Sequence, residues 1–529
     1  MATNQNTAFQ KMLIGGKDCY GPLTNLLLSL ASLPTVLWLF SFHMHPALLI
    51  DEILENILNH VLDWDSEKEY RWTLAQLARC CKSWKDPALD RIWKRLADMK
   101  PIVGLESQEL SSYTSRVKQI TLRGDTGYSP SEHVLAFPRL QYALLEGAGC
   151  NAPINWALSH SLHRLKVDMR CTNSKVDVQY ERCEHVTKIV QHIQNASNEG
   201  LQKLHLRGCI TSSLNRVIGV LTSLRSLTLL TGSTLTPRLL TEITTFPFLQ
   251  ELRLHAAHID ADWFRTTKTP SESPTFPSLR RLHIRGQQSL IHAIVELLQL
   301  DTLEHLYLEA DRPALDITAW TPIMDTLAVK ASRSLRQLTI EHCTELDTPT
   351  NNIHLMGLSS FTLQHIKSLS NCAAMRKFTL DTTLPIKFTD RDIEDMSSWW
   401  PFLECLDLGA LPGPHEDPAC SPTLTVKALS HLAGHCPELK DLIIPLDLSA
   451  SSEDDPSEVV PQQKLKTLRI GRVADSKSIS SFVQTVLMMF PSVEAIECET
   501  SDGEVPVALP GRQEPDTGAG TEDELANGQ

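Results

Sequence analysis

Hydrophobic residues recur in one pattern along most of the chain after Pro101. Each copy reads apolar, two variable residues, apolar, one variable residue, apolar, as in Leu201–Leu206, and its last three positions alternate like a half-buried strand. Successive copies are mostly 22 to 30 residues apart, with four longer gaps of 32 to 40. A period of this length predicts a solenoid of stacked repeats. The copies begin at Val117, Leu140, Leu162, Leu201, Leu224, Leu249, Leu279, Leu303, Leu335, Met375, Leu403, Leu439, Leu465 and Val493.

The intervals between these strands carry helical patterns. Between His185 and Ile193, for example, the apolar residues fall at steps of three and four, which places them on one helical face. A Phe-Pro or Cys-Pro pair often precedes the next strand, as at Phe246-Pro247 and Cys436-Pro437, and proline there ends the helix. Residues 101–500 are therefore predicted to be an α/β solenoid: a curved parallel sheet with outer helices, in which stacking supplies the core.

A different pattern occupies Leu49–Leu96, where three short amphipathic helices are predicted in fewer than fifty residues. The first runs over about Asp51–Leu62, and the third is expected to begin at Asp86-Pro87, because proline favours the first helical turn. So short a unit buries too little surface to be stable alone. It predicts a docking module that completes its core with a partner. The second helix carries Trp72, Leu74, Leu77, Ala78, Cys81 and Trp84, and the third carries Leu89, Ile92, Trp93 and Leu96.

The order of residue types in this segment resembles the F-box. Leu49, Glu52, Ile53 and Leu54 match the opening of the family pattern, Ile57 and Leu58 its second apolar pair, and Cys81, Trp84, Pro87, Leu89 and Trp93 the remainder. The chain departs from the pattern at Ile50, which occupies the proline position, and the linker Asp63–Arg71 is long. The resemblance implies docking to a Skp-type adaptor and, through it, to a cullin ubiquitin ligase. It implies that the adaptor surface, or the core behind it, is supplied by Leu49, Ile53, Leu54, Ile57, Leu58, Leu77, Trp84 and Trp93.

The repeats resemble the irregular leucine-rich repeats that follow F-boxes in many proteins, notably in large fungal sets. The stretch Leu384–Leu408 is similar to the basidiomycete sets in particular, and the combined resemblance covers about 45–500. Few units carry the Asn or Cys that forms a ladder in the repeat turns, although Cys209 and Cys343 fit that position. The resemblance implies a non-catalytic substrate-recognition subunit of an SCF-type ubiquitin ligase, in which the repeats bind a client protein.

The variable residues of each strand are expected to point away from the core, onto the face that repeat proteins commonly use for binding. On the early strands these residues include five Lys or Arg against one Glu, and on the later strands five acids against one Lys. One hypothesis is that the basic half binds an acidic or phosphorylated client segment. The alternative is a solvated face with chance clustering. The candidate client-binding residues are Lys203, Arg207, Arg253, Arg281 and Arg285.

Charge and cysteine usage narrow the class of protein. The net charge is −14, but residues 450–463 contribute −4 and residues 501–529 contribute −6, so the rest is nearly balanced and a broad nucleic-acid surface is not expected. The 13 cysteines include no CxxC pair, which argues against a disulfide framework or zinc site and favours the cytosol or nucleus. Residues 450–463 are predicted to be an acidic solvated loop and 501–529 a disordered acidic tail.

No catalytic constellation and no cofactor motif is found in the sequence. His255, His258, Asp260 and Asp262 could be read as metal ligands, but scattered residues of these types are more often ordinary surface residues, and no metal is predicted. The F-box is assigned to 44–100 and an apolar extension to 1–43, within which Leu23–Phe42 is long enough to span a membrane. A start at Met44 would remove that segment. The alternative function is a non-ligase interaction scaffold with a degenerate F-box. Residues 23–42 leave open that such a scaffold is tethered to a membrane.

Overall fold

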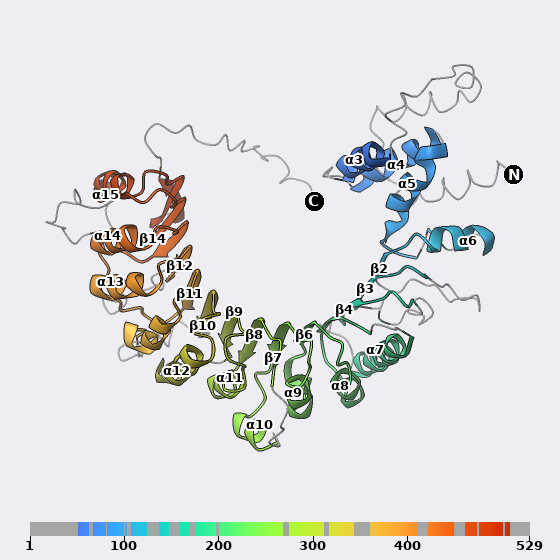
Figure 1. Ribbon diagram of the computed structural model, residues 1–529, viewed down its shortest axis with the longest axis horizontal. Helices are drawn as coiled ribbons and strands as arrows, with labels where there is room; N and C mark the ends of the chain where they lie inside the picture. Colours follow the sequence, from blue (N-terminus) through green and yellow to red (C-terminus); the bar gives the residue numbers. More distant parts are fainter. Residues whose placement is uncertain are drawn as a thin grey trace, which may run out of the picture. The chain divides into compact units, whose positions relative to one another are not determined.

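The computed structural model describes most of the chain between residues 51 and 507 (Figure 1). It divides into two compact units, Met1–Leu227 and Thr228–Gln529, and each is described by itself below. The described residues are 51–62, 67–80, 82–99, 101–102, 107–123, 137–147, 150, 159–169, 176–196, 200–267, 275–311, 317–342, 360–409, 422–448, 461–472, 476–500 and 503–507. The predicted extension 1–43, Leu49 and Ile50 therefore lie outside the described residues.

The first unit opens with three helices, α3 (Asp51–Leu62), α4 (Glu67–Cys80) and α5 (Lys82–Lys94). The first helix has its predicted bounds. The predicted start of the third helix at Asp86-Pro87 is wrong, because Pro87 lies inside α5 and Trp84 belongs to α5 as well. Proline there removes one intrahelical hydrogen bond, which is offset because Trp84, Leu89, Ile92 and Trp93 are buried along one side of the helix. The predicted linker Asp63–Arg71 is shorter than expected, because α4 already begins at Glu67.

The same unit continues directly into a parallel sheet whose strands pair in chain order. The strands are β1 (Arg95–Leu96), β2 (Gln119–Arg123), β3 (Tyr142–Glu146), β4 (Arg164–Asp168) and β5 (Lys203–Arg207). Helices α6 (Ser107–Thr114), α7 (Val176–Ala196) and α8 (Ser212–Gly219) lie between strands in the chain. The second and fourth residues of β2 to β5 are in register and buried, as the alternating pattern predicts.

Strand β6 (Ser226–Leu230) spans the division, and the second unit repeats the same design. Its parallel strands are β7 (Glu251–His255), β8 (Arg281–Gly286), β9 (His305–Ala310), β10 (Gln337–His342), β11 (Lys377–Thr382), β12 (Cys405–Asp407), β13 (Asp441–Ile444), β14 (Thr467–Arg472) and β15 (Ala495–Thr500). A last strand, β16 (Gly503–Val507), pairs antiparallel with β15. The predicted disordered tail therefore does not begin at 501, and residues 508–529 lie outside the described residues.

Helices cover one side of this second sheet (Figure 1). They are α9 (Pro237–Ile243), α10 (Ala261–Thr267), α11 (Gln288–Val295), α12 (Trp320–Lys330), α13 (Asp390–Trp399), α14 (Val426–His435) and α15 (Ser476–Met489), with short 3-10 segments η4 (Gly232–Thr234), η5 (Ile317–Ala319), η7 (Leu363–His365) and η8 (Lys367–Asn371). The core fills the layer between them, where strand residues such as Leu282 and Ile284 and helix residues such as Leu290 and Ile294 are buried. This arrangement confirms the predicted α/β solenoid of leucine-rich repeats.

Serine and glutamine form a polar ladder in the turns that precede the strands, a different position from that of Cys209, which follows β5. In three repeats a serine precedes the first leucine of the repeat by one or three residues. Its hydroxyl donates to the carbonyl of the first leucine of the previous repeat: Ser159 to Leu140 at 3.0 Å, Ser223 to Leu201 at 3.0 Å and Ser334 to Leu303 at 2.6 Å. Gln462 does the same to Leu439 at 2.7 Å. These bonds satisfy carbonyls that would otherwise be buried without a partner.

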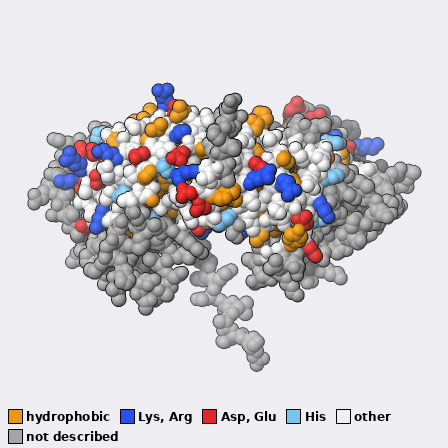
Figure 2. All heavy atoms as spheres, turned by 90° about the horizontal axis from the view of Figure 1, so that it is seen from below, with side chains coloured by type: hydrophobic (Ala, Val, Ile, Leu, Met, Phe, Trp, Pro, Cys, Tyr) orange, Lys and Arg blue, Asp and Glu red, His pale blue; other side chains and the backbone are white. Residues whose placement is uncertain are grey.

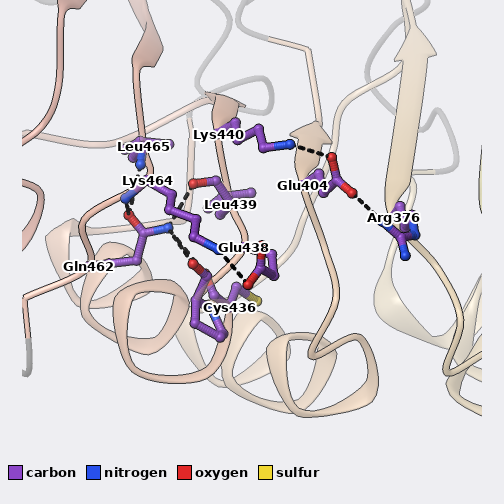
Figure 3. A network of polar contacts seen from close by, with 10 residues as sticks. Arg376, Glu404, Cys436, Glu438, Leu439, Lys440, Gln462, Lys464 and Leu465 are labelled. Atoms are coloured by element: carbon purple, nitrogen blue, oxygen red, sulfur yellow. Dashed lines mark hydrogen bonds and ion pairs between the residues drawn. The ribbon is translucent and has the colours of Figure 1, made fainter.

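Gln462 also corrects the prediction for residues 450–463. Only 4 % of its surface is exposed, so this residue of the predicted solvated loop is buried, although the adjacent Gln463 is exposed. Figure 3 shows its amide between two successive turns, where it donates to Cys436 and Leu439 and accepts from the backbone of Lys464 and Leu465. A polar residue in a charged stretch is therefore part of the interior, because the turn before β14 brings it against unpaired backbone groups.

Candidate functional site

The predicted adaptor-binding residues separate into a core and a surface on the three-helix unit. Leu54, Leu58, Trp84 and Trp93 are buried and hold α3, α4 and α5 together. Ile53 and Ile57, one turn apart on α3, and Leu77 on α4 are only partly buried. A partner can therefore contact the latter three directly, whereas the buried four support them from behind.

Trp72 on α4 was not among the predicted site residues, although it is 41 % exposed. Large aromatic side chains bury much apolar area on binding and are enriched at interfaces. Its position in the helical pattern was visible in the sequence, but its exposure depends on how α4 packs against α5. Trp72 is therefore a further exposed apolar residue of this unit. We call the partly exposed residues Ile53, Ile57 and Leu77 the helical dock.

The three helices that carry the helical dock are joined to the first repeat by polar and aromatic contacts. Arg116, which precedes β2, pairs with Asp86 at 2.7 Å and with Asp90, and both aspartates lie on α5. Although partial burial opposes it, hydrogen bonding to these two carboxylates raises the pKa of Arg116 above its usual value. Trp93 stacks on Tyr113 of α6 with ring centroids 4.5 Å apart. These contacts join α5, which precedes β1, to residues that follow β1. The helices are therefore held against the first repeat by side-chain contacts as well as by the chain connection.

In the second unit, the side of the sheet opposite the buried leucines carries three rows of polar residues, which we call the strand face. The parallel register aligns neighbouring strands residue by residue. From β7 to β11 the first row is Glu251, Arg281, His305, Gln337 and Lys377. The second row is Arg253, His283, Tyr307, Thr339 and Thr379, and the third is His255, Arg285, Glu309, Glu341 and Asp381.

Most of the predicted client-binding arginines are already engaged by carboxylates. Arg281 pairs with Glu251 at 2.6 Å, and Arg285 pairs with both Glu309 and Asp311 at 2.8 Å. Figure 2 views the molecule from the side of the outer helices, and there too positive and negative side chains are interspersed. The bipolar face expected from the sequence is therefore partly neutralised, because the register places Arg285 of β8 beside Glu309 of β9 and Arg281 of β8 beside Glu251 of β7.

The remaining predicted client-binding residues differ in their pairing. In the first unit Arg207 lies 3.7 Å from Asp168 on the neighbouring strand β4. Lys203 on β5 and Arg253 on β7 are exposed and form no ion pair with any residue that the structure describes. Arg253, Arg281 and Arg285 lie on two adjacent strands, so they share one patch of the second unit. Lys203 and Arg207 belong to the first unit.

An aromatic pair lies in the middle of the strand face. His283 stacks on Tyr307 with ring centroids 4.1 Å apart and an interplanar angle of 15°, and the Tyr307 hydroxyl donates to Glu341. Burial and the nearby charge of Arg253 lower the pKa of His283 to about 4, even though Glu309 lies 3.6 Å from its ring. The imidazole is therefore neutral near pH 7.

Burial also shapes the ionisation of the groups around this pair. It raises the pKa of Glu309, an effect that Arg285 opposes and that the neighbouring carboxylates of Glu341 and Asp311 reinforce. The pKa of Tyr307 is raised by burial and by its bond to Glu341. The arrangement offers flat aromatic surface, hydrogen-bonding groups and paired charges, which suit reversible binding of another protein chain.

The candidate metal ligands around His258 have other roles. Asp260 accepts hydrogen bonds from the backbone of Asp262 and Trp263, and so caps the start of α10, while His258 contacts the carbonyl of Leu235 at 2.6 Å. Within the described ranges, no three His, Cys, Asp or Glu side chains are grouped closely enough to hold a metal ion. None of the helices described, moreover, combines the length and apolar character needed to cross a membrane; Leu23–Phe42 lies outside them.

Comparison with known proteins gives little beyond this geometry. No protein-family model matches the sequence, and no curated protein matches it. Among solved structures, an internalin of Listeria monocytogenes is similar with 11 % sequence identity over 63 % of this chain and 82 % of the internalin, at a TM-score of 0.32. That score is too low to support a conclusion about this chain, whose leucine-rich repeat fold is established by its own strand register and buried leucines.

Proposed function

We propose that the chain is the substrate-recognition subunit of an SCF-type cullin ubiquitin ligase, acting in the cytosol or nucleus. In this proposal α3–α5 form an F-box that docks a Skp-type adaptor, and the repeats bind a client protein for ubiquitination. The observation that carries the proposal is the helical dock itself: Ile53, Ile57 and Leu77 remain partly exposed beside a core built on the two tryptophans of the F-box pattern, Trp84 and Trp93.

The anchoring of this dock suits the proposed role. A substrate receptor works by raising the effective concentration of its client beside the conjugating enzyme, and that gain is lost when the two sites cannot be engaged together. The Arg116 pairs and the Trp93–Tyr113 stack attach α5 to the first repeat. An anchored connection restricts where a bound client can lie, which favours transfer to a limited set of its lysines.

Adaptor binding by the full-length protein tests the ligase role. Ile57→Glu places a charge in the apolar surface and should weaken binding to a Skp-type adaptor by about tenfold or more, since a buried unpaired charge at an interface costs several kcal/mol. Asn56→Glu introduces the same charge at the adjacent, exposed position of α3 and should leave binding unchanged. Binding isotherms with purified adaptor measure both, and circular dichroism checks that each variant is folded.

The alternative is an interaction scaffold whose F-box does not recruit a ligase. Ile50 in the proline position of the family pattern favours it. Absence of adaptor binding by the unsubstituted protein, under conditions in which an established F-box protein binds, would reject the ligase role and leave this scaffold role. A membrane-tethered form depends on residues 23–42, and mass spectrometry of the protein's N-terminal peptide tests whether that segment is present.

On the client side, the polar strand residues of each unit remain the proposed binding residues. Arg253 and Lys203 are the predicted residues best able to meet an acidic or phosphorylated group, because each is exposed and has no ion pair with a described residue. Arg207, Arg281 and Arg285 would first have to release a neighbouring carboxylate. Arginine in such pairs contributes less to a new partner, since the existing bonds must be broken.

A further inference from the structure

An open groove of about 670 Å³ lies in the second unit, separate from the strand face. Its walls come from the C-terminal end of α12, from the residues around the end of η8 and from the turn before β12. These three segments precede β10, β11 and β12 in the chain, so the groove lies at the edge of the sheet where those strands begin. It is built by neighbouring repeats and by no single one of them.

The groove combines large apolar residues at its rim with small ones in its walls. Val329 is 67 % exposed and Phe402 is 55 % exposed, and both belong to its lining. Ala328, Ala373 and Ala374 lie among them and leave space that larger side chains would fill. Exposed apolar residues grouped around a concavity are typical of a binding surface.

The charges around this groove are mainly positive. Arg333 lines it, and Lys330 and Arg336 lie three residues to either side; none of the three forms an ion pair with a described residue. The nearby carboxylate of Asp301 accepts a hydrogen bond from the backbone amide of Arg333. A second basic group, Arg376, is already paired with Glu404. The unpaired cations are therefore complementary to an acidic partner.

We propose that this groove docks a short segment of a partner protein, in which one large apolar side chain enters between Val329 and Phe402 and is flanked by Asp or Glu residues that meet Arg333. The apolar contact would supply affinity, and the charges would set the orientation and exclude basic segments. Identifying that partner with the ubiquitination client rests on the proposed function, whereas docking itself does not require a ligase.

A displayed library of random dodecapeptides, selected on the immobilised full-length protein, tests the proposal directly. Enriched peptides should carry an aromatic, Leu or Met residue next to acidic residues. Ala374→Trp fills the groove and should reduce their binding by about tenfold or more, and Arg333→Glu should reduce it several-fold by reversing the charge. Ala97→Trp and Arg391→Glu make the same changes at exposed positions outside the groove and should have no effect.

Several results would overturn the proposal. They are the absence of any enriched peptide, enrichment of basic peptides, and binding that survives Ala374→Trp. Self-association of the protein that is abolished by Ala374→Trp, measured by sedimentation, would assign the groove to a second copy of the chain instead. Adaptor binding is measured on the same variants, and its absence in the unsubstituted protein would reject the ligase role without affecting the groove. Circular dichroism and thermal unfolding check that Ala374→Trp is folded.

Discussion

Replacing Gln462 with alanine should destabilise the end of the second unit more than its sequence context suggests. The side chain Nε2 donates to the carbonyl of Leu439 at 2.7 Å, and Oε1 accepts from the amides of Leu465 at 2.8 Å and Lys464 at 2.9 Å (Figure 3). Alanine removes these bonds and the longer ones to the carbonyls of Cys436 at 3.4 Å and Pro437 at 3.3 Å. The amide at Lys464 is exposed enough to find water, but the carbonyl of Leu439 and the amide of Leu465 belong to buried residues.

The expected loss follows from those two buried groups. Each buried donor or acceptor left without a partner costs about 1–3 kcal/mol, so Gln462→Ala should lower the local stability by about 2–4 kcal/mol once some water entry is allowed for. Since about 1.4 kcal/mol corresponds to a tenfold change, the backbone amide of Leu465 should exchange with solvent at least about 30-fold faster. The effect should be concentrated around β13 and β14, because repeat proteins transmit stability mainly between neighbouring units.

Hydrogen–deuterium exchange of the peptide that contains Leu465 measures this change. Gln463→Ala is the matched control, since Gln463 is the adjacent residue of the same type and is exposed. It should leave the exchange rate within about twofold of the unsubstituted protein, as surface substitutions usually change stability by less than 0.5 kcal/mol. Equal exchange in the two variants would refute the reasoning, because the buried amide would then contribute no more than a solvated one.

Two further predictions concern the anchored dock and the strand face. Arg116→Met should loosen α5 by about 1 kcal/mol, a modest value because both aspartates are largely exposed. Arg123→Met removes an ion pair to Glu146 of β3 that does not involve α5 and should leave α5 unchanged; equal hydrogen exchange of α5 in the two variants would contradict the anchoring. The pKa of His283 in the folded protein is about 4, below that of histidine in the unfolded chain, so protonation favours unfolding. The free energy of unfolding should therefore fall as the pH is lowered from about 6.5 to 4, by at most about 1.4 kcal/mol per pH unit and by less after solvent screening. His283→Gln should flatten that pH dependence in urea unfolding, and an imidazole NMR titration with a midpoint near 6.5 would refute it.

The positions of the strands could be predicted from the sequence because their signal is local. An alternating apolar pattern within six residues selects a half-buried strand, whatever lies elsewhere in the chain. The observed strands β2 to β15 begin at the third residue of the predicted copies, directly before the second apolar position, as at Lys203 and Arg281. Helix α3 was equally well marked, since its apolar residues keep the helical spacing over its full length.

Features that depend on packing were predicted less well. The start of α5 was placed at the proline, because proline commonly opens a helix, yet burial of Trp84 extends the helix to Lys82. A polar ladder was sought from Asn or Cys after the strands, but the observed ladder lies before the strands and uses a serine hydroxyl or a glutamine amide. Any donor of suitable length can fill that role, so residue type alone did not reveal it.

The sequence by itself determined the fold class of this protein: short helices followed by an α/β solenoid of leucine-rich repeats, with buried leucines on one side of each strand and variable residues on the other. Only the tertiary structure decided which of these variable residues are already held in ion pairs and which are available to bind a partner. The parallel register sets Arg281 beside Glu251 and Arg285 beside Glu309, while Arg253 has no ion pair with a described residue. It also brings Val329 and Phe402 to one groove from different repeats. Periodicity in a sequence specifies which side of its own element a residue occupies, but its neighbours come from strands and turns that are distant in the chain.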